Sequence, residues 1–198
     1  MIASKGYPAE THTLTTEDCY ILEMHRIPQG QNKKENRPPV LLLHGILGSS
    51  ADWVMASPSQ SLGFILADAG YDVWLGNMRG NTYSRGHCTL SPDEVEFWDF
   101  SFDHVGQYDI PAMMDKIQEV TGAQKIFYVG FSMGTTSFFA MANTRPEYQD
   151  KLYMANLLAP VAYVDHMTSP LRYIAPFTDQ LDVSEMHLSV AKICTSSI

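Results

Sequence analysis

The sequence has few basic residues, few cysteines and no long hydrophobic run. Thirteen lysines and arginines stand against 22 aspartates and glutamates, which gives a net charge of −9 over 198 residues. This balance argues against a nucleic-acid partner or an anionic membrane held by charge, but it does not oppose a neutral lipid. Three cysteines without a Cys-x-x-Cys pair predict neither a disulfide framework nor a zinc or redox site.

Signals for targeting are also missing from the sequence. Residues 1–8 contain no apolar core of a signal peptide, and no Asn-x-Ser/Thr glycosylation acceptor is present. The longest apolar runs, such as residues 40–43, are far too short to cross a bilayer, so we predict no transmembrane segment. The residues alone therefore leave the compartment unknown.

Hydrophobic and charged residues make up 45% and 18% of the chain, which is a globular composition. Residues 40–43 are a continuous apolar run, typical of a strand buried on both faces. Further strands are expected at 71–75, 126–129 and 154–158, helices at 62–69, 105–120 and 135–143, and a hairpin at 11–16 and 20–27. This order predicts a single α/β domain with a mostly parallel sheet, entered through an antiparallel hairpin and covered by helices on both faces.

The sharpest motif is Gly130-Phe131-Ser132-Met133-Gly134, between an expected strand and an expected helix. A Gly-x-Ser-x-Gly in that context predicts a nucleophile elbow, in which the serine takes a strained conformation and both glycines avoid a collision. The helix that follows directs its free N–H groups at the reaction centre. The alternative is an ordinary glycine-rich turn, but the strand before and the helix after favour Ser132 as a nucleophile.

A second motif, His44-Gly45-Ile46-Leu47-Gly48, directly follows the buried apolar run. In folds with a nucleophile elbow, this loop supplies one oxyanion donor and the residue after the nucleophile supplies the other. We therefore predict that the backbone N–H groups of Ile46 and Met133 form an oxyanion hole. His44 itself is expected to be structural rather than a general base.

These motifs resemble the acid lipases, the family that includes gastric lipase and lysosomal acid lipase. The resemblance covers nearly the whole chain up to about residue 165 and rests on motifs in the family's order. They are Gly6-Tyr7-Pro8, Thr16-Glu17-Asp18, Tyr20-Ile21-Leu22, Arg26-Ile27-Pro28, His44–Ser50, Leu66–Asn77, Arg79–Thr82, Phe97-Trp98, Phe100–Asp103, Tyr108-Asp109, Pro111-Ala112, Gly130–Thr136 and Leu158–Ala162.

The resemblance implies an α/β-hydrolase fold and hydrolysis of neutral lipid esters, either triacylglycerols or cholesteryl esters. It also implies a secreted or lysosomal setting and no cofactor. Two residues depart from the pattern of the family: Cys19 stands where glycine is typical, and Met133 where glutamine is typical. Because the oxyanion hole uses backbone N–H groups, the second departure leaves that role intact.

Ser132 needs a histidine to take its proton and a carboxylate to orient that histidine. In this fold the two partners follow the nucleophile, at the ends of later strands. Only residues 159–198 follow the last expected strand, which is too few for two further crossover units of roughly 30 residues each. We therefore expect an incomplete domain: a hairpin and loop (1–38), a core (39–164) and the start of a lid or cap (165–198).

Some acidic and histidine residues are available as partners, but none has a convincing position. Asp165, His166, Asp182 and His187 follow the nucleophile and are expected to be solvated surface groups. His12, His25, His87 and His104 precede it, in the wrong order for this fold. The aromatic segment 97–102 is expected to be core rather than a lipid-binding stripe.

The sequence thus predicts an acid-lipase-like serine ester hydrolase that lacks its acid and base. One alternative is a catalytically incompetent, truncated product that binds lipid or partners. Another is an esterase or thioesterase for shorter acyl chains. An uncovered sheet edge after residues 154–158 also predicts self-association.

Overall fold

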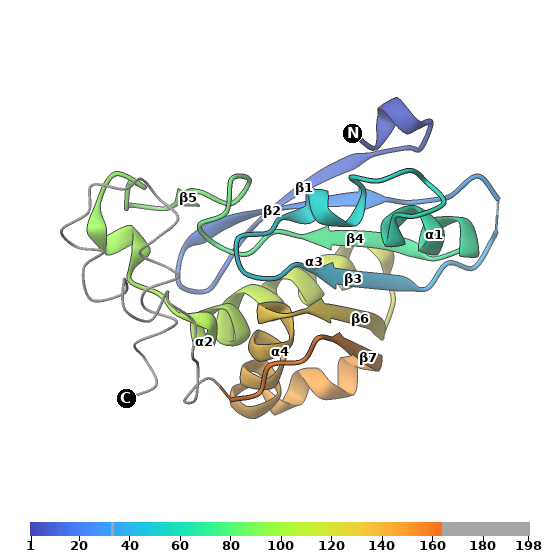
Figure 1. The fold of residues 1–198 in the computed structure, drawn as a ribbon. Helices are drawn as coiled ribbons and strands as arrows, with labels where there is room; N and C mark the ends of the chain where they lie inside the picture. Colours follow the sequence, from blue (N-terminus) through green and yellow to red (C-terminus); the bar gives the residue numbers. More distant parts are fainter. Residues whose placement is uncertain (33, 164–198) are drawn as a thin grey trace.

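The strands lie side by side in one mixed sheet in the computed structural model, which describes residues 1–32 and 34–163 (Figure 1). Seven strands of this described part pair in the order β1-β2-β4-β3-β6-β7, with β5 beside β2. They are β1 (Glu10–Thr15), β2 (Tyr20–Ile27), β3 (Pro39–Leu43), β4 (Asp72–Gly76), β5 (Gly86–His87), β6 (Ile126–Phe131) and β7 (Leu152–Leu158). The pairs β4–β3, β3–β6 and β6–β7 are parallel and the pairs around β2 are antiparallel, which confirms the expected sheet entered through a hairpin.

Helices connect the parallel strands. The longer ones are α1 (Leu62–Ala69), α3 (Ile110–Thr121) and α4 (Met133–Thr144), and the shorter ones are η1 (Ala3–Lys5), η2 (Ser50–Trp53), η3 (Val95–Trp98), α2 (Phe102–His104), η4 (Val105–Asp109) and η5 (Pro146–Lys151). The bounds of α1 are those predicted, since Gly70 ends the helix in the left-handed conformation at φ 100°. The helix α4 and the strand β7 each begin two residues earlier than expected.

The central strand β3 is buried on both faces, as its apolar run predicts. Val40 and Leu42 pack into one hydrophobic cluster, on the side that α1 covers. Leu41 and Leu43 pack into a second cluster on the opposite side, with residues of α3 and α4. Because successive side chains of a strand point to opposite faces, a continuous apolar run fits a strand between two helical layers.

The aromatic segment 97–102 supplies side chains to the second cluster. Phe97, Trp98 and Phe100 are buried, with at most 6% of each residue exposed. The Tyr20 hydroxyl donates a hydrogen bond to the Phe97 carbonyl and so joins this segment to β2. The prediction that the segment belongs to the core is confirmed.

The helix expected at 105–120 begins with a π-helical turn and continues as α3. The turn η4 lies between α2 and α3, and Pro111 stands at the start of α3. A proline has no N–H to donate, and its ring collides with the carbonyl four residues earlier, here that of Gln107. The wider turn accommodates the ring, and the Gln107 carbonyl instead accepts a hydrogen bond from Arg145 at 3.2 Å.

The turn between β1 and β2 holds a residue in an unfavourable conformation. The Cys19 N–H donates to the Thr16 carbonyl at 3.0 Å, and the Thr16 N–H donates to the Tyr20 carbonyl at 2.8 Å. Cys19 has φ 75°, the left-handed region that glycine adopts without strain. This hairpin position often has glycine in a bulge, and a side chain there costs roughly 1–2 kcal/mol.

The strand β7 lies at one edge of the sheet in the described part of the chain. Its Tyr153, Met154 and Leu158 are 60%, 56% and 43% exposed. Self-association through this edge stays a prediction. The expected lid or cap at 165–198 lies outside the described residues. Among the residues described, no helix combines the length and the apolar character that crossing a bilayer requires.

Candidate active site

Ser132 occupies the turn that joins β6 to α4. Its backbone has φ 50° and ψ −114°, a conformation that residues with a side chain rarely adopt. The Ser132 N–H donates to the Leu158 carbonyl at 3.0 Å, and its own carbonyl accepts from Thr135 at 2.8 Å. The serine is therefore held in a strained turn between two parallel strand ends and at the N-terminus of a helix.

The two glycines around this turn lie where any side chain would collide. A Cβ built on Gly130 would lie 2.9 Å from the backbone of Gly134. A Cβ built on Gly134 would lie 2.7 Å from the Leu43 carbonyl oxygen and 2.9 Å from that of His44. Glycine at both positions therefore lets α4 approach β6 and the end of β3 closely.

The loop after β3 reaches the same place. A Cβ built on Gly45 would lie 3.0 Å from Ser132 Cβ, so the backbone of Gly45 packs directly against the serine. From Gly45 the chain makes a tight turn, closed by a 3.1 Å hydrogen bond from the Gly48 N–H to the Gly45 carbonyl. Leu47 in this turn has φ 63° and Ile46 is 37% exposed. The structure thus brings both sequence motifs together, while the oxyanion roles of Ile46 and Met133 stay predictions.

His44 supports this loop from inside the protein. Its Nδ1 donates to the Gly45 carbonyl at 2.7 Å, and its Nε2 accepts from the Met78 N–H at 3.2 Å and from Asn81 at 3.1 Å. Because its partners fix one nitrogen as donor and the other as acceptor, His44 is a neutral ring with the proton on Nδ1. Burial lowers the pKa of His44. Both nitrogens are occupied, so His44 has a structural role, as the sequence analysis expects.

Two asparagines that the sequence analysis did not single out complete this support. Asn77 accepts from the Ser50 N–H at 2.9 Å and from Asn81 at 2.8 Å, and it donates to the Glu23 carbonyl at 2.9 Å. These bonds join the loop after β3 to the loop after β4 and to β2. The sequence does carry a signal for this role. Asn77 directly follows a buried strand and Asn81 lies four residues later, and polar groups gather after the strand ends of a parallel sheet.

The buried, neutral His44 should make folding stability depend on pH. Below its ordinary pKa of 6.5 the unfolded chain binds this proton and the folded chain does not. Stability is therefore fully present above that value and falls as the pH drops toward the lowered pKa of the folded state, with a slope of at most about 1.4 kcal/mol per pH unit. Urea unfolding between pH 7 and pH 5.5 measures this slope.

The variant His44→Gln should be less stable at pH 7 but should flatten that slope. His12→Gln is the matched control, because His12 lies on β1 beside Glu10 and away from the loop. An unchanged slope in His44→Gln would contradict the assignment of a buried neutral ring.

The other four histidines in the described part of the chain do not gather around Ser132. Each has a partner of its own: His12 with Glu10 at 2.8 Å, His25 with Glu23 at 2.9 Å, His87 with the Asp18 carbonyl at 3.2 Å, and His104 with the Ser101 N–H at 3.0 Å. In residues 1–32 and 34–163 no histidine makes a hydrogen bond to the Ser132 hydroxyl. Asp165, His166, Asp182 and His187 lie outside the described residues.

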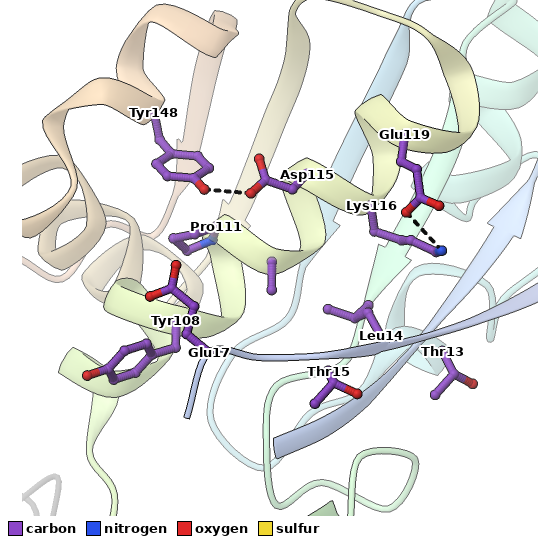
Figure 2. A pocket seen from close by; sticks show the side chains of 11 residues that line it. Thr13, Leu14, Thr15, Glu17, Tyr108, Pro111, Asp115, Lys116, Glu119 and Tyr148 are labelled. Carbon is purple, nitrogen blue, oxygen red and sulfur yellow. Dashed lines mark hydrogen bonds and ion pairs between the residues drawn. The ribbon is translucent and has the colours of Figure 1, made fainter. Parts of the chain in front are cut away.

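A groove of about 590 Å³ lies elsewhere, between β1 and α3 (Figure 2). Its walls are rich in charged groups: Tyr148 donates to Asp115 at 2.6 Å, and Lys116 pairs with Glu119 at 3.0 Å. None of the residues of the Ser132 turn lines this groove. Within the described part of the chain, no group of three histidine, cysteine or acidic side chains is placed to hold a metal ion.

Comparison with known proteins agrees with this geometry. Residues 1–57 match the model of a partial alpha/beta-hydrolase lipase region, and residues 38–186 match that of the alpha/beta hydrolase fold. Lipase member M of Mus musculus is 52% identical over 173 residues, covering 86% of this chain and 41% of the mouse protein. Gastric triacylglycerol lipase of Rattus norvegicus is 50% identical over 178 residues, covering 88% of this chain and 45% of the rat protein.

The fold also matches solved structures of low sequence identity. A probable hydrolytic enzyme from Pseudomonas aeruginosa aligns with a TM-score of 0.53 at 22% identity, covering 79% of this chain and 42% of that one. At this identity the match supports the fold alone. The chain spans less than half the length of the two curated relatives.

Proposed function

Because this chain belongs to the α/β-hydrolase family, and to the acid lipases within it, we propose that its site cleaves neutral lipid esters with Ser132 as nucleophile. The observation that carries the proposal is the strained backbone of Ser132, held at the start of α4 against the Gly45 loop. A serine without a chemical role gains nothing from such a conformation.

In the proposed reaction, the Ser132 hydroxyl attacks the ester carbonyl and the alcohol leaves. Water then hydrolyses the acyl-enzyme and restores the serine. The N–H groups of Met133 and Ile46 hold the oxyanion, and each such donor is worth about 3–4 kcal/mol in the transition state. These steps need only protein groups and water.

The general base and its carboxylate are proposed to follow β7 in the chain, in the order that this fold uses. The hydroxyl of Ser132 makes no hydrogen bond to a histidine in the described part of the chain, which supports that placement. Acylation is proposed to need those partners, because a serine hydroxyl without a base keeps an ordinary reactivity.

Apolar groups around the serine favour a lipid substrate. Phe131, which contacts the Gly45 backbone region, is 45% exposed, and Leu47 in the adjoining turn is 60% exposed. The name of the rat relative, a gastric triacylglycerol lipase, supports triacylglycerols as the substrate class. We propose cholesteryl esters as the second substrate class, and secretion or a lysosomal location.

Labelling with alkyl phosphonate esters tests this function. We expect the chain to be modified on Ser132, as shown by peptide mass mapping. A long-chain probe should react faster than a short-chain probe. Ser132→Ala should remove the label, whereas Ser59→Ala, in an exposed loop, should not change it.

Each result separates the candidate functions. A rate equal to that of a complete serine hydrolase would support a base that follows β7 within this chain. A preference for the short probe would favour an esterase or thioesterase of short acyl chains. No label on Ser132 would overturn the proposal and leave the non-catalytic alternative, a product that binds lipid or partners.

A further inference from the structure

Two cysteines that the proposed function does not use meet beside the β1–β2 hairpin. The strands β2 and β5 are antiparallel, with Tyr20 opposite His87 and Ile21 opposite Gly86. The next pair in this register is Cys19 and Cys88, and the Cys88 N–H donates to the Cys19 carbonyl at 3.0 Å. This backbone bond holds the two cysteines beside each other at the end of the β2–β5 pair.

The two side chains are already in contact as thiols. A hydrogen bond between the two sulfur atoms, together with burial, raises the pKa of the Cys19 thiol. Cys88 is also the more accessible of the two, since it is exposed whereas Cys19 is half-buried.

The backbone spacing suits a covalent bond. Residues that exchange both backbone hydrogen bonds in an antiparallel pair have Cα atoms about 5.5 Å apart. Cys19 and Cys88 share one of the two bonds, since the Cys19 N–H donates to the Thr16 carbonyl instead. Disulfides span the same separation, most often about 5.5–6 Å. The 3.0 Å backbone hydrogen bond between the two residues holds them as neighbours, which a disulfide between them requires.

Neighbouring groups favour a disulfide over a metal site. His87 precedes Cys88, but its Nε2 lies 3.2 Å from the Asp18 carbonyl, and its Nδ1 accepts from the Leu90 N–H at 3.0 Å. Cys19 also occupies a position whose φ of 75° favours glycine, so the thiol is placed there against the local backbone preference. A bond to the opposing Cys88 explains why a cysteine stands at this position.

We propose that Cys19 and Cys88 are a redox-active pair that forms a disulfide by exchange with a low-molecular-weight disulfide such as glutathione disulfide. The Cys88 thiolate attacks one sulfur of glutathione disulfide, forms a mixed disulfide and releases one glutathione thiolate. The Cys19 thiolate then attacks the Cys88 sulfur, breaks the mixed disulfide and releases the second glutathione. Both cysteines lose their protons, and the two electrons they give up reduce the glutathione disulfide to two thiols.

The bond would join two segments that also hold the Arg79 ion pairs. Asp18, next to Cys19, accepts two hydrogen bonds from Arg79 at 2.6 and 2.9 Å. Closing the chain between residues 19 and 88 restricts the unfolded state, and long closed loops are restricted most. Oxidation should therefore raise the melting temperature by roughly 5–10 °C, and reduction should reverse the change.

The test is equilibration of the whole chain in glutathione buffers from reducing to oxidising. We expect the protein to lose the mass of two hydrogen atoms, and proteolysis without reductant should yield one cross-linked pair of peptides that contain Cys19 and Cys88. Cys194→Ser removes the third cysteine, which lies outside the described residues, and should leave the cross-link intact. The melting temperature should rise with oxidation in this variant.

Two control variants each lack one cysteine of the pair and are expected to fold. Cys88→Ser changes an exposed side chain, and Cys19→Gly removes the strain of φ 75°, so both should fold and neither should respond to oxidation. A cross-link that includes Cys194 would overturn the proposal. Accumulation of Cys88 as a stable mixed disulfide with glutathione would overturn it as well, because Cys19 would then have failed to attack.

Discussion

Replacing Arg79 with methionine is expected to lower the free energy of unfolding by about 3–5 kcal/mol. The guanidinium is fully buried, and its Nη2 lies 2.6 Å from Asp109 Oδ1, on a carboxylate that is also fully buried. A second carboxylate, that of Asp18, accepts from Nη1 at 2.6 Å. Removal of the cation leaves two carboxylates without a counter-charge, one of them wholly inside the protein.

The surroundings of Arg79 show why this charge is held so firmly. Burial by itself would lower the pKa of the guanidinium, but the charge of Asp109 and the hydrogen bond with Asp18 raise it above its usual value. The ring of Tyr20 lies 4.0 Å from the guanidinium carbon, an additional cation–π contact. The Arg79 N–H also donates to Asp109 at 2.9 Å, so the loop after β4 is fixed to η4 by backbone and side chain together.

Urea unfolding followed by circular dichroism measures the loss. The control is Lys116→Met, because Lys116 makes a partly exposed ion pair with Glu119 on α3, and pairs of this kind contribute less than about 0.5 kcal/mol. If the methionine variant fails to fold, Arg79→Lys retains the charge but loses the paired geometry, and it should show a smaller loss. A change below about 1 kcal/mol for Arg79→Met would show that the network is not a structural element of this fold.

Gly134→Ala is expected to lower the free energy of unfolding by about 3 kcal/mol, although alanine ordinarily stabilises a helix relative to glycine by about 1 kcal/mol. The sign reverses because the new Cβ would lie 2.7 Å from the Leu43 carbonyl oxygen and 2.9 Å from that of His44. Both obstacles are backbone atoms at the end of a strand buried on both faces, so neither can move aside cheaply.

The substitution should also affect the site, since α4 can accept the methyl group only by moving away from the His44–Gly45 segment. Phosphonate labelling of Ser132 should therefore slow together with the loss of stability. Gly122→Ala is the control: Gly122 has φ 71° but no atom within 4 Å of its built Cβ, so strain alone applies and the cost is about 1 kcal/mol. Equal costs for the two variants would contradict the steric explanation.

The sequence predicted best those features that depend on neighbouring residues. The apolar run of β3, the helix α1 with its terminal Gly70, and the strand–serine–helix turn are all local patterns of burial and glycine placement. The acid-lipase resemblance and the mixed, helix-covered sheet are confirmed as well. Each of these follows from periodicity or from motifs whose spacing sets the backbone conformation.

The sequence predicted poorly those features that depend on contacts between distant segments. Arg79 bonds Asp18 and Asp109 across 61 and 30 residues, and no local pattern indicates which acids surround it. The pair of Cys19 and Cys88 depends on β5, a strand of two residues that is too short to show a period. The π-helical turn depends on Pro111 and on Arg145, which lies in another helix-terminal segment.

The strained backbone of Ser132 also bears on the evolution of this chain. Glycine adopts φ 50° and ψ −114° without the steric cost that serine incurs. Selection for folding stability alone therefore favours glycine at position 132. Under the proposed function, selection on ester cleavage favours serine. The two pressures then oppose each other at one codon, and a lineage released from the second is expected to drift toward glycine there.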